Sequence, residues 1–144
     1  MSTVERAFSI AFEAHRGQKD KAGAPYIMHP LRVAASLRGD DAQIVGLLHD
    51  VVEDSPWTLE LIAAEGFSAE VVSGLDAVTR RNGEDYDAFC RRAATDPLGR
   101  IVKRADLLDN MDASRLGELT ERDRARLEKC RRALASINAI EDHT

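Results

Sequence analysis

The sequence contains few cysteines and few aromatic residues. Of its 144 residues, only 5% are Phe, Trp or Tyr, and the two cysteines are Cys90 and Cys130. These two cysteines form no CxxC motif and lack the spacing of metal-binding thiolates, and both lie in helix-like segments. We therefore expect free, buried thiols of a reducing compartment rather than a disulfide.

Long apolar runs are also absent. No apolar run is long enough to cross a bilayer, and residues 1–6 mix acidic and basic side chains instead of forming the apolar core of a signal peptide. We expect a cytoplasmic protein that does not associate with membranes. The net charge of −5 argues against nucleic-acid binding, which depends on neutralising phosphates with Lys and Arg. A phosphorylated small molecule would need local basic residues or a metal to offset the overall charge.

No segment alternates apolar and polar residues as a strand does, and there is no repeat or low-complexity tract. Apolar residues instead recur at three- and four-residue steps, which is typical of amphipathic helices. Ser2 or Thr3, Thr58 and Ser68 stand at predicted helix N-termini as capping residues. The predicted helices cover residues 3–16, 29–38, 40–54, 58–65, 69–79, 84–95, 98–111 and 121–140.

A chain of this length can bury roughly two-thirds of its unfolded surface in one core. We therefore predict a single all-α domain, a helical bundle of seven to eight helices, over residues 1–144. Its core is expected at about 3–138, followed by a flexible C-terminal tail that contains His143.

Four ionisable residues interrupt the apolar stretch 44–54, namely His49, Asp50, Glu53 and Asp54. On one continuous helix, 49/53 and 50/54 are i,i+4 pairs, so all four side chains share a face. Three carboxylates and an imidazole on an apolar helix repel one another and are costly to desolvate, and a bound divalent cation removes this difficulty. The alternative is a solvated polar face that ends in an acidic pair.

Further metal ligands must come from other segments, because adjacent residues on a helix project about 100° apart. His29 enters a helix just before a proline, and Asp106 lies in a second apolar helix with Asn110 one turn further on. His15 ends the first predicted helix, where an imidazolium is favourable without any function. Two imidazoles and two carboxylates suit Mn²⁺, Fe²⁺, Co²⁺ or Zn²⁺ better than Ca²⁺.

The set His29, His49-Asp50 and Asp106 resembles the H…HD…D signature of the HD-domain metal-dependent phosphohydrolases. The sequence around these residues, at 21–34, 47–54 and 102–111, is similar to that of the hydrolase domain of the RelA/SpoT proteins. In length, the chain is most similar to the stand-alone small alarmone hydrolases, which include the metazoan SpoT homologue. The resemblance extends from about residue 5 to residue 135.

The resemblance implies Mn²⁺, or another divalent transition metal, bound by His29, His49, Asp50 and Asp106. It also implies that Glu53 and Asp54 act on the water that attacks a ribose 3′-pyrophosphate ester. The expected reaction converts guanosine tetra- or pentaphosphate (ppGpp or pppGpp) to GDP or GTP and pyrophosphate.

Four residues are candidates for contacts with the nucleotide substrate: Lys21, Tyr26, Lys103 and Asn110. Most have a structural alternative. Lys21 could be a solvated loop lysine, Tyr26 could pack under the loop, and Lys103 could pair with a neighbouring acid. Arg80 and Arg81 are expected to be solvated in a turn.

Four positions depart from the family's pattern. Asp20 stands where a basic residue typically helps to hold guanine, Leu107 and Asp109 replace the arginine and the histidine of the family's Asp-Arg-Leu-His-Asn stretch, and Ala113 replaces a hydroxyl residue. Two alternatives therefore stay open. One is hydrolysis of another phosphorylated nucleotide, such as an adenosine alarmone (ppApp or pppApp) or the 2′-phosphate of NADPH, and the other is a non-catalytic nucleotide-sensing module. Synthetase activity is not expected at this length, and a homodimer stays open.

Overall fold

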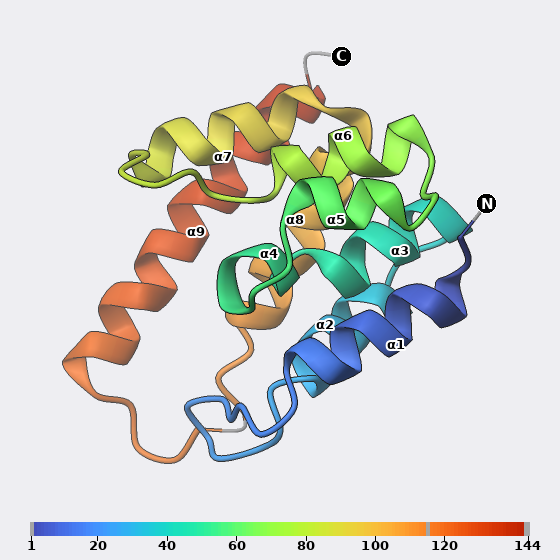
Figure 1. Ribbon diagram of the computed structural model, residues 1–144. Helices are drawn as coiled ribbons and strands as arrows, with labels where there is room; N and C mark the ends of the chain where they lie inside the picture. The colour runs from blue at the N-terminus through green and yellow to red at the C-terminus, as the bar shows by residue number, and fades with distance from the viewer. Residues whose placement is uncertain (1, 115, 143–144) are drawn as a thin grey trace.

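The computed structural model describes residues 2–114 and 116–142, and this part of the chain contains nine α-helices and no strand (Figure 1). The prediction of an all-α fold is confirmed, with one helix more than expected. The helices are α1 (Val4–Ala14), α2 (Met28–Ala35), α3 (Asp40–Leu48), α4 (Val51–Asp54), α5 (Leu59–Ala64), α6 (Ala69–Ala77), α7 (Tyr86–Thr95), α8 (Pro97–Asn110) and α9 (Glu121–Asp142).

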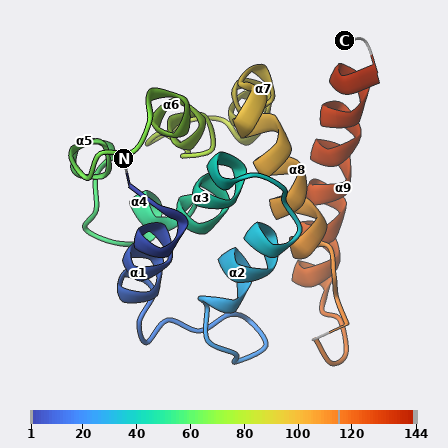
Figure 2. The ribbon, with the colours of Figure 1, turned by 90° about the vertical axis from the view of Figure 1, so that its right-hand side faces the viewer.

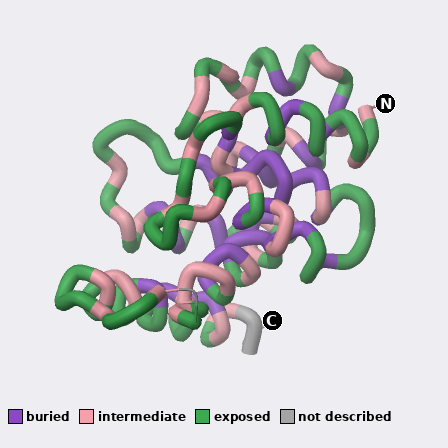
Figure 3. The backbone as a smooth tube through the Cα atoms, turned by 90° about the horizontal axis from the view of Figure 1, so that it is seen from below, coloured by how far each residue is buried: buried purple, intermediate pink, exposed green. Residues whose placement is uncertain are grey.

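Helix α3 is the centre of the fold. It packs against α1, α2, α6 and α8, and every residue from Ile44 to Leu48 is buried (Figure 2). Gly46 allows the close approach of α2, because a Cβ atom at this position would lie only 3.3 Å from the Cα atom of Ala34. In Figure 3 the buried stretches run through the interior while exposed residues cover the outside. The most apolar stretch of the sequence therefore becomes the core helix.

A second, smaller core joins α7, α8 and α9. Its buried members include Cys90, Leu107, Cys130 and Ile137. Both cysteines are free and buried, as predicted. Among the described helices, none is long and apolar enough to cross a membrane.

The predicted caps Thr3, Thr58 and Ser68 are confirmed, since each side-chain oxygen accepts the backbone N–H three residues further on. Helix α9 continues to Asp142, two residues past its predicted end. His143, in the predicted C-terminal tail, lies outside the described residues.

The prediction of one helix over residues 40–54 is wrong. Helix α3 ends at Leu48, His49 and Asp50 form a turn, and α4 is a separate single turn of helix. In a continuous helix the Gly46 carbonyl accepts the Asp50 N–H, but here it accepts Nδ1–H of the His49 ring at 2.6 Å. Residues 49 and 53 therefore lie on opposite sides of a break, whereas the Asp54 N–H still bonds the Asp50 carbonyl (3.0 Å).

Candidate metal and catalytic site

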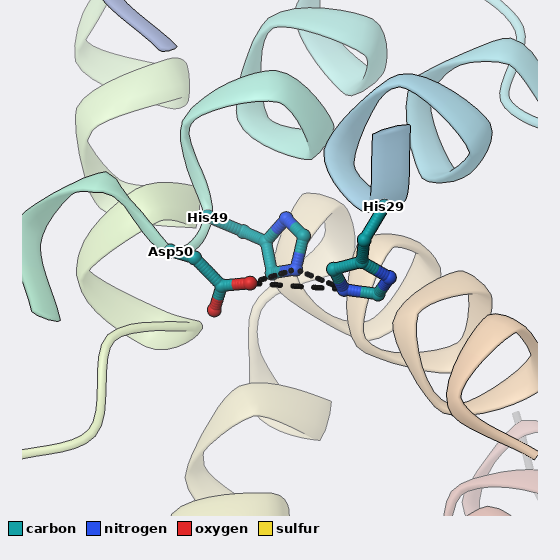
Figure 4. Close-up of side chains that lie close together, drawn as sticks. All are labelled: His29, His49 and Asp50. Carbon is teal, nitrogen blue, oxygen red and sulfur yellow. Dashed lines mark hydrogen bonds and ion pairs between the residues drawn. The ribbon is translucent and has the colours of Figure 1, made fainter. Parts of the chain in front are cut away.

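His29, His49 and Asp50 point toward one another from two parts of the fold (Figure 4). His29 is on α2, and the other two residues form the turn between α3 and α4. The Nε2 atoms of the two histidines are 3.2 Å apart, and Asp50 Oδ2 lies 3.1 Å from His49 Nε2 and 3.7 Å from His29 Nε2. Because α3 ends at Leu48, the turn at residues 49–50 sets the directions of these two adjacent side chains, and both face the same point.

Asp106 brings a fourth donor from α8. Its Oδ1 atom lies 2.9 Å from His29 Nε2 and 3.2 Å from His49 Nε2. The buried Lys103 ammonium donates to Oδ2 of the same carboxylate (3.1 Å), and the Asn110 amide donates to Oδ1 (3.2 Å). The structure thus places all four predicted ligands in one cluster.

Hydrogen bonds at the far side of each imidazole fix which nitrogen faces the cluster. His49 Nδ1 must be the donor in its bond to the Gly46 carbonyl, because a carbonyl only accepts. His29 Nδ1 likewise faces a carboxylate, Oδ2 of Asp109, at 2.6 Å. Both Nε2 atoms are therefore left to act as metal ligands, an arrangement common among metal-binding histidines.

Asp109 is one residue of the site that sequence reasoning did not place there. It is itself held by Arg32 through two hydrogen bonds of 2.7 and 3.0 Å. A signal was present in the spacing, because Arg32 follows His29 by three residues on α2 and Asp109 follows Asp106 by three on α8. Residues three apart share a helix face, so each ligand and its neighbour point toward the facing helix.

The electrostatics of the cluster favour positive charge at its centre. Burial raises the pKa of Asp50, but the adjacent His49 outweighs this and brings the pKa down to about 2. Burial likewise opposes ionisation of Asp106, yet Lys103 and His49 hold its pKa well below the usual range. Two carboxylates and two imidazole nitrogens in this field fit a divalent transition-metal cation.

Glu53 and Asp54, the predicted catalytic pair, lie on α4 just beyond the cluster. The Glu53 side chain is exposed, but neighbouring atoms remove part of its water, and this desolvation together with the Asp50 charge raises its pKa to about 7, although its Oε1 accepts the Arg80 N–H at 3.2 Å. Burial, followed by the Asp50 charge, also raises the pKa of Asp54. Both groups are thus less acidic than ordinary carboxylates, and Glu53 changes protonation near neutral pH.

Two cavities, of about 330 and about 260 Å³, open beside the cluster. Both are lined by Tyr26, His29, Asn110 and Arg126. The larger also has walls from the loop between α1 and α2, including Lys21, and the smaller reaches Asp50, Glu53, Lys103 and Asp106. All four predicted substrate contacts therefore line at least one cavity, whereas Asp54 lines neither of these two.

The smaller cavity carries basic side chains that sequence reasoning did not place there. Arg80, which is exposed as expected, also lines it, and its backbone N–H donates to Glu53; Arg126 and Lys129 reach the cavity from α9. No local pattern could identify the two α9 residues, because only the packing of α9 against α7 and α8 brings them to the site.

Tyr26 and His15 lie under the cluster. The Tyr26 hydroxyl donates to Asp50 Oδ2 at 2.5 Å, so this residue contacts a candidate ligand as well as the cavities. His15 is 2% exposed, with its ring centroid 5.0 Å from that of Tyr26. It ends α1 as predicted, and it is therefore a buried residue beside the site.

The helical fold and its converging His and Asp side chains define the class of this protein. Residues 7–142 match the HD domain family, and the chain belongs to this family.

Among its relatives, a probable GTP pyrophosphokinase of Mycobacterium leprae is 39% identical over 128 residues, which are 80% of this chain and 16% of that protein. A guanosine-3′,5′-bis(diphosphate) 3′-pyrophosphohydrolase of Aquifex aeolicus is 38% identical over 120 residues, which are 75% of this chain and 17% of that protein. The chain thus spans less than a fifth of the length of these relatives.

A solved structure described as a metazoan ortholog of SpoT that hydrolyses ppGpp has the same fold. Its TM-score is 0.74 at 23% identity, and the match covers 93% of this chain and 84% of that one. The arrangement of helices is thus shared over nearly all of both chains.

Proposed function

We propose that this protein is a metal-dependent phosphohydrolase that removes pyrophosphate from the 3′ position of ppGpp or pppGpp, giving GDP or GTP. The observation that carries the proposal is the buried cluster of His29, His49, Asp50 and Asp106, with Glu53 beside it in a cavity lined by basic side chains. The relatives named as 3′-pyrophosphohydrolases support the choice of reaction.

The four cluster residues would hold Mn²⁺ or a similar divalent cation. When bound, the cation supplies positive charge that screens the phosphate and lowers the pKa of water next to it. Asp109 and the Gly46 carbonyl keep the two Nε2 lone pairs directed at the cation.

Glu53 acts as the general base. A carboxylate with a pKa of about 7 can take a proton from water and return it near neutral pH. The water oxygen attacks the phosphorus atom that is bonded to the ribose 3′ oxygen. The bond between this phosphorus and the 3′ oxygen breaks, and Glu53 passes the proton it took from the water to the 3′ oxygen. Asp54, next to Glu53 on α4, orients the same water.

The basic side chains of the smaller cavity receive the phosphates. Arg80, Arg126 and Lys129 supply local positive charge in a chain whose net charge is −5. The nucleoside lies in the larger cavity, where Lys21 and Asn110 offer polar contacts. Lys103 contacts the phosphates only while it also holds Asp106.

A second candidate is the same chemistry on another nucleotide, ppApp, pppApp or NADPH. The observation that favours it is the Asp20 carboxylate in the wall of the larger cavity. Its Oδ1 accepts the N–H groups of Ala22 and Ala24, both at 2.9 Å, so Asp20 also holds the loop in shape. A non-catalytic sensing module is less favoured, because such a module has no use for a carboxylate poised near neutral pH beside the cluster.

The test is release of pyrophosphate and phosphate from ppGpp, ppApp and NADPH by Mn²⁺-loaded protein. Pyrophosphate from ppGpp, lost in Glu53→Gln, supports the proposal. Release of phosphate from NADPH, with no product from ppGpp or ppApp, would support the second candidate in place of ppGpp hydrolysis. If the metal-bound protein releases neither product from any of the three nucleotides, both the proposed reaction and the second candidate are overturned.

The choice of base is tested with Asp20→Asn, which keeps the oxygen that accepts the two loop N–H groups but removes the charge. If Asp20 selects the base, the ratio of kcat/KM values for ppGpp and ppApp changes several-fold. An unchanged ratio would show that residue 20 does not choose the base.

A further inference from the structure

The loop between α1 and α2 is a small hairpin. The Tyr26 N–H bonds the Gln18 carbonyl, and the Asp20 N–H bonds the Ala24 carbonyl, both at 2.9 Å. Gly23, with φ of +88°, makes the turn at the tip. Gln18 and Tyr26 are therefore the paired residues at the base of the hairpin.

Each of these paired residues extends its side chain to the segment Asp50–Asp54. The Tyr26 hydroxyl donates to Asp50 Oδ2 at the start of the segment. The Gln18 side-chain amide donates to the Asp54 backbone carbonyl at its end, at 3.0 Å. One hairpin thus holds both ends of the segment that carries Glu53.

The orientation of the Gln18 amide is fixed by its partners. Its nitrogen also lies 3.2 Å from the Ala14 carbonyl, and two carbonyls can only accept, so the NH₂ group must face them. The Gln18 oxygen then faces His15 Nδ1 at 2.8 Å, and the histidine donates. Because the buried His15 ring packs on Tyr26, these three side chains form one unit.

The segment needs such support because α4 has only four residues. A single helical turn is not stable by itself, and the carbonyls at a helix end lack partners within the helix. The chain leaves α4 at Ser55 in an extended conformation. The Gln18 amide supplies the missing donor at this end.

We infer that Gln18 is a positioning residue: together with Tyr26 it clamps the segment Asp50–Asp54, and so holds Glu53 and Asp54 in place relative to the metal ligands. The inference rests on the proposed roles of Glu53 and Asp54. The same hairpin carries Lys21 in the wall of the larger cavity, so the clamp joins the nucleotide-facing loop to the catalytic turn.

The test compares Gln18→Met and Gln18→Glu with a matched control, Gln43→Met. The Gln43 amide also donates to a backbone carbonyl outside its own helix, that of Leu37 at 3.2 Å, but Gln43 is not among the residues of the cluster or of the two cavities beside it. Gln18→Glu keeps an acceptor for His15, removes the donor to the Asp54 and Ala14 carbonyls and adds a negative charge, whereas Gln18→Met removes donor and acceptor without adding charge. Steady-state kinetics, Mn²⁺ titration by calorimetry and hydrogen exchange of the amides of residues 51–55 in metal-free protein are measured for each variant.

Both Gln18 variants are expected to lower kcat about tenfold while KM and Mn²⁺ affinity change less than about twofold, because small displacements of catalytic groups reduce turnover strongly. The amides of residues 51–55 exchange about tenfold faster in these variants, as expected when local opening becomes easier. Gln43→Met changes neither quantity.

Unchanged kcat and exchange in both Gln18 variants would overturn the clamp. Equal losses in Gln43→Met, with faster exchange throughout the chain, would overturn it too, because they indicate a general effect on stability. If the wild-type protein hydrolyses none of the nucleotides, the proposed function fails, and the exchange of residues 51–55 alone decides the clamp.

Discussion

Each residue of the buried cluster is held by a second residue from another part of the chain or about one helical turn away, whereas the hairpin tip in the wall of the larger cavity is held within its own loop. The partners in the cluster are Asp109 for His29, the Gly46 carbonyl for His49, Tyr26 for Asp50 and Lys103 for Asp106. In the wall, Asp20 bonds the N–H groups of Ala22 and Ala24 in the same hairpin. The comparison teaches that contacts between distant segments, together with local bonds, fix the geometry of the cluster, while exposed side chains at the tip of the hairpin can change at little structural cost.

The largest effect is expected for Asp106→Ala. It removes a ligand and leaves the Lys103 ammonium buried without its counter-ion, which costs about 3–5 kcal/mol. The metal content should fall, and so should the thermal unfolding temperature, measured with and without Mn²⁺. Asp41→Ala, at an exposed position in the first turn of α3, serves as the control and should change stability by less than about 0.5 kcal/mol. Unchanged metal content would remove Asp106 from the ligand set.

Asp109→Ala is expected to come next. It removes the acceptor that orients His29, so Mn²⁺ affinity should fall roughly 10- to 100-fold although no ligand is lost. Calorimetric titration measures the change. Asp109→Asn, which keeps an oxygen toward His29, should lose less affinity. Equal Mn²⁺ affinity in wild type and Asp109→Ala would show that the Asp109 contact with His29 does not contribute to metal binding.

A change in the loop should leave the metal site intact. Lys21→Met is expected to raise KM for ppGpp about tenfold through loss of a charge-assisted contact, with Mn²⁺ affinity unchanged. Initial rates over a range of substrate concentrations give this value. A fall in Mn²⁺ affinity would contradict the separation of the two regions.

The smallest effect is expected for Glu53→Gln on the pH dependence of the free energy of unfolding. The pKa of Glu53 is about 7 in the folded protein and about 4.5 when unfolded, so the folded state binds more protons between these values and stability falls as pH rises through this window. Glu53→Gln should therefore stabilise the metal-free protein at pH 8, by less than about 1 kcal/mol because the side chain is exposed, and have no effect near pH 4. Thermal unfolding at the two pH values checks this, and equal effects at both would contradict the raised pKa.

Much of the fold could be predicted from local sequence. Thr3, Thr58 and Ser68 cap the helices they precede because the capping bond spans only three residues. The break between α3 and α4 could not be predicted, since it depends on the His49 ring bonding Gly46 and on Tyr26 and Gln18 reaching across from another loop. Helical periodicity continues through the break, so the pattern gives no warning of it.

The residues of the site divide in the same way. The ligand types and their order along the chain, His29, His49-Asp50 and Asp106, are properties of the sequence. Helix α9 contributes Arg126 and Lys129 to the smaller cavity only through packing.

The sequence by itself determined the helical class, the caps and the identity of the candidate ligands, because periodicity, capping and side-chain chemistry act over a few residues. Tertiary structure alone decided the break at His49-Asp50, the support of His29 by Asp109 and the clamp on α4. The support of His29 and the clamp join residues far apart in the chain, and their contact energy is realised only when the helices pack. The break combines that clamp with the local bond between the His49 ring and the Gly46 carbonyl.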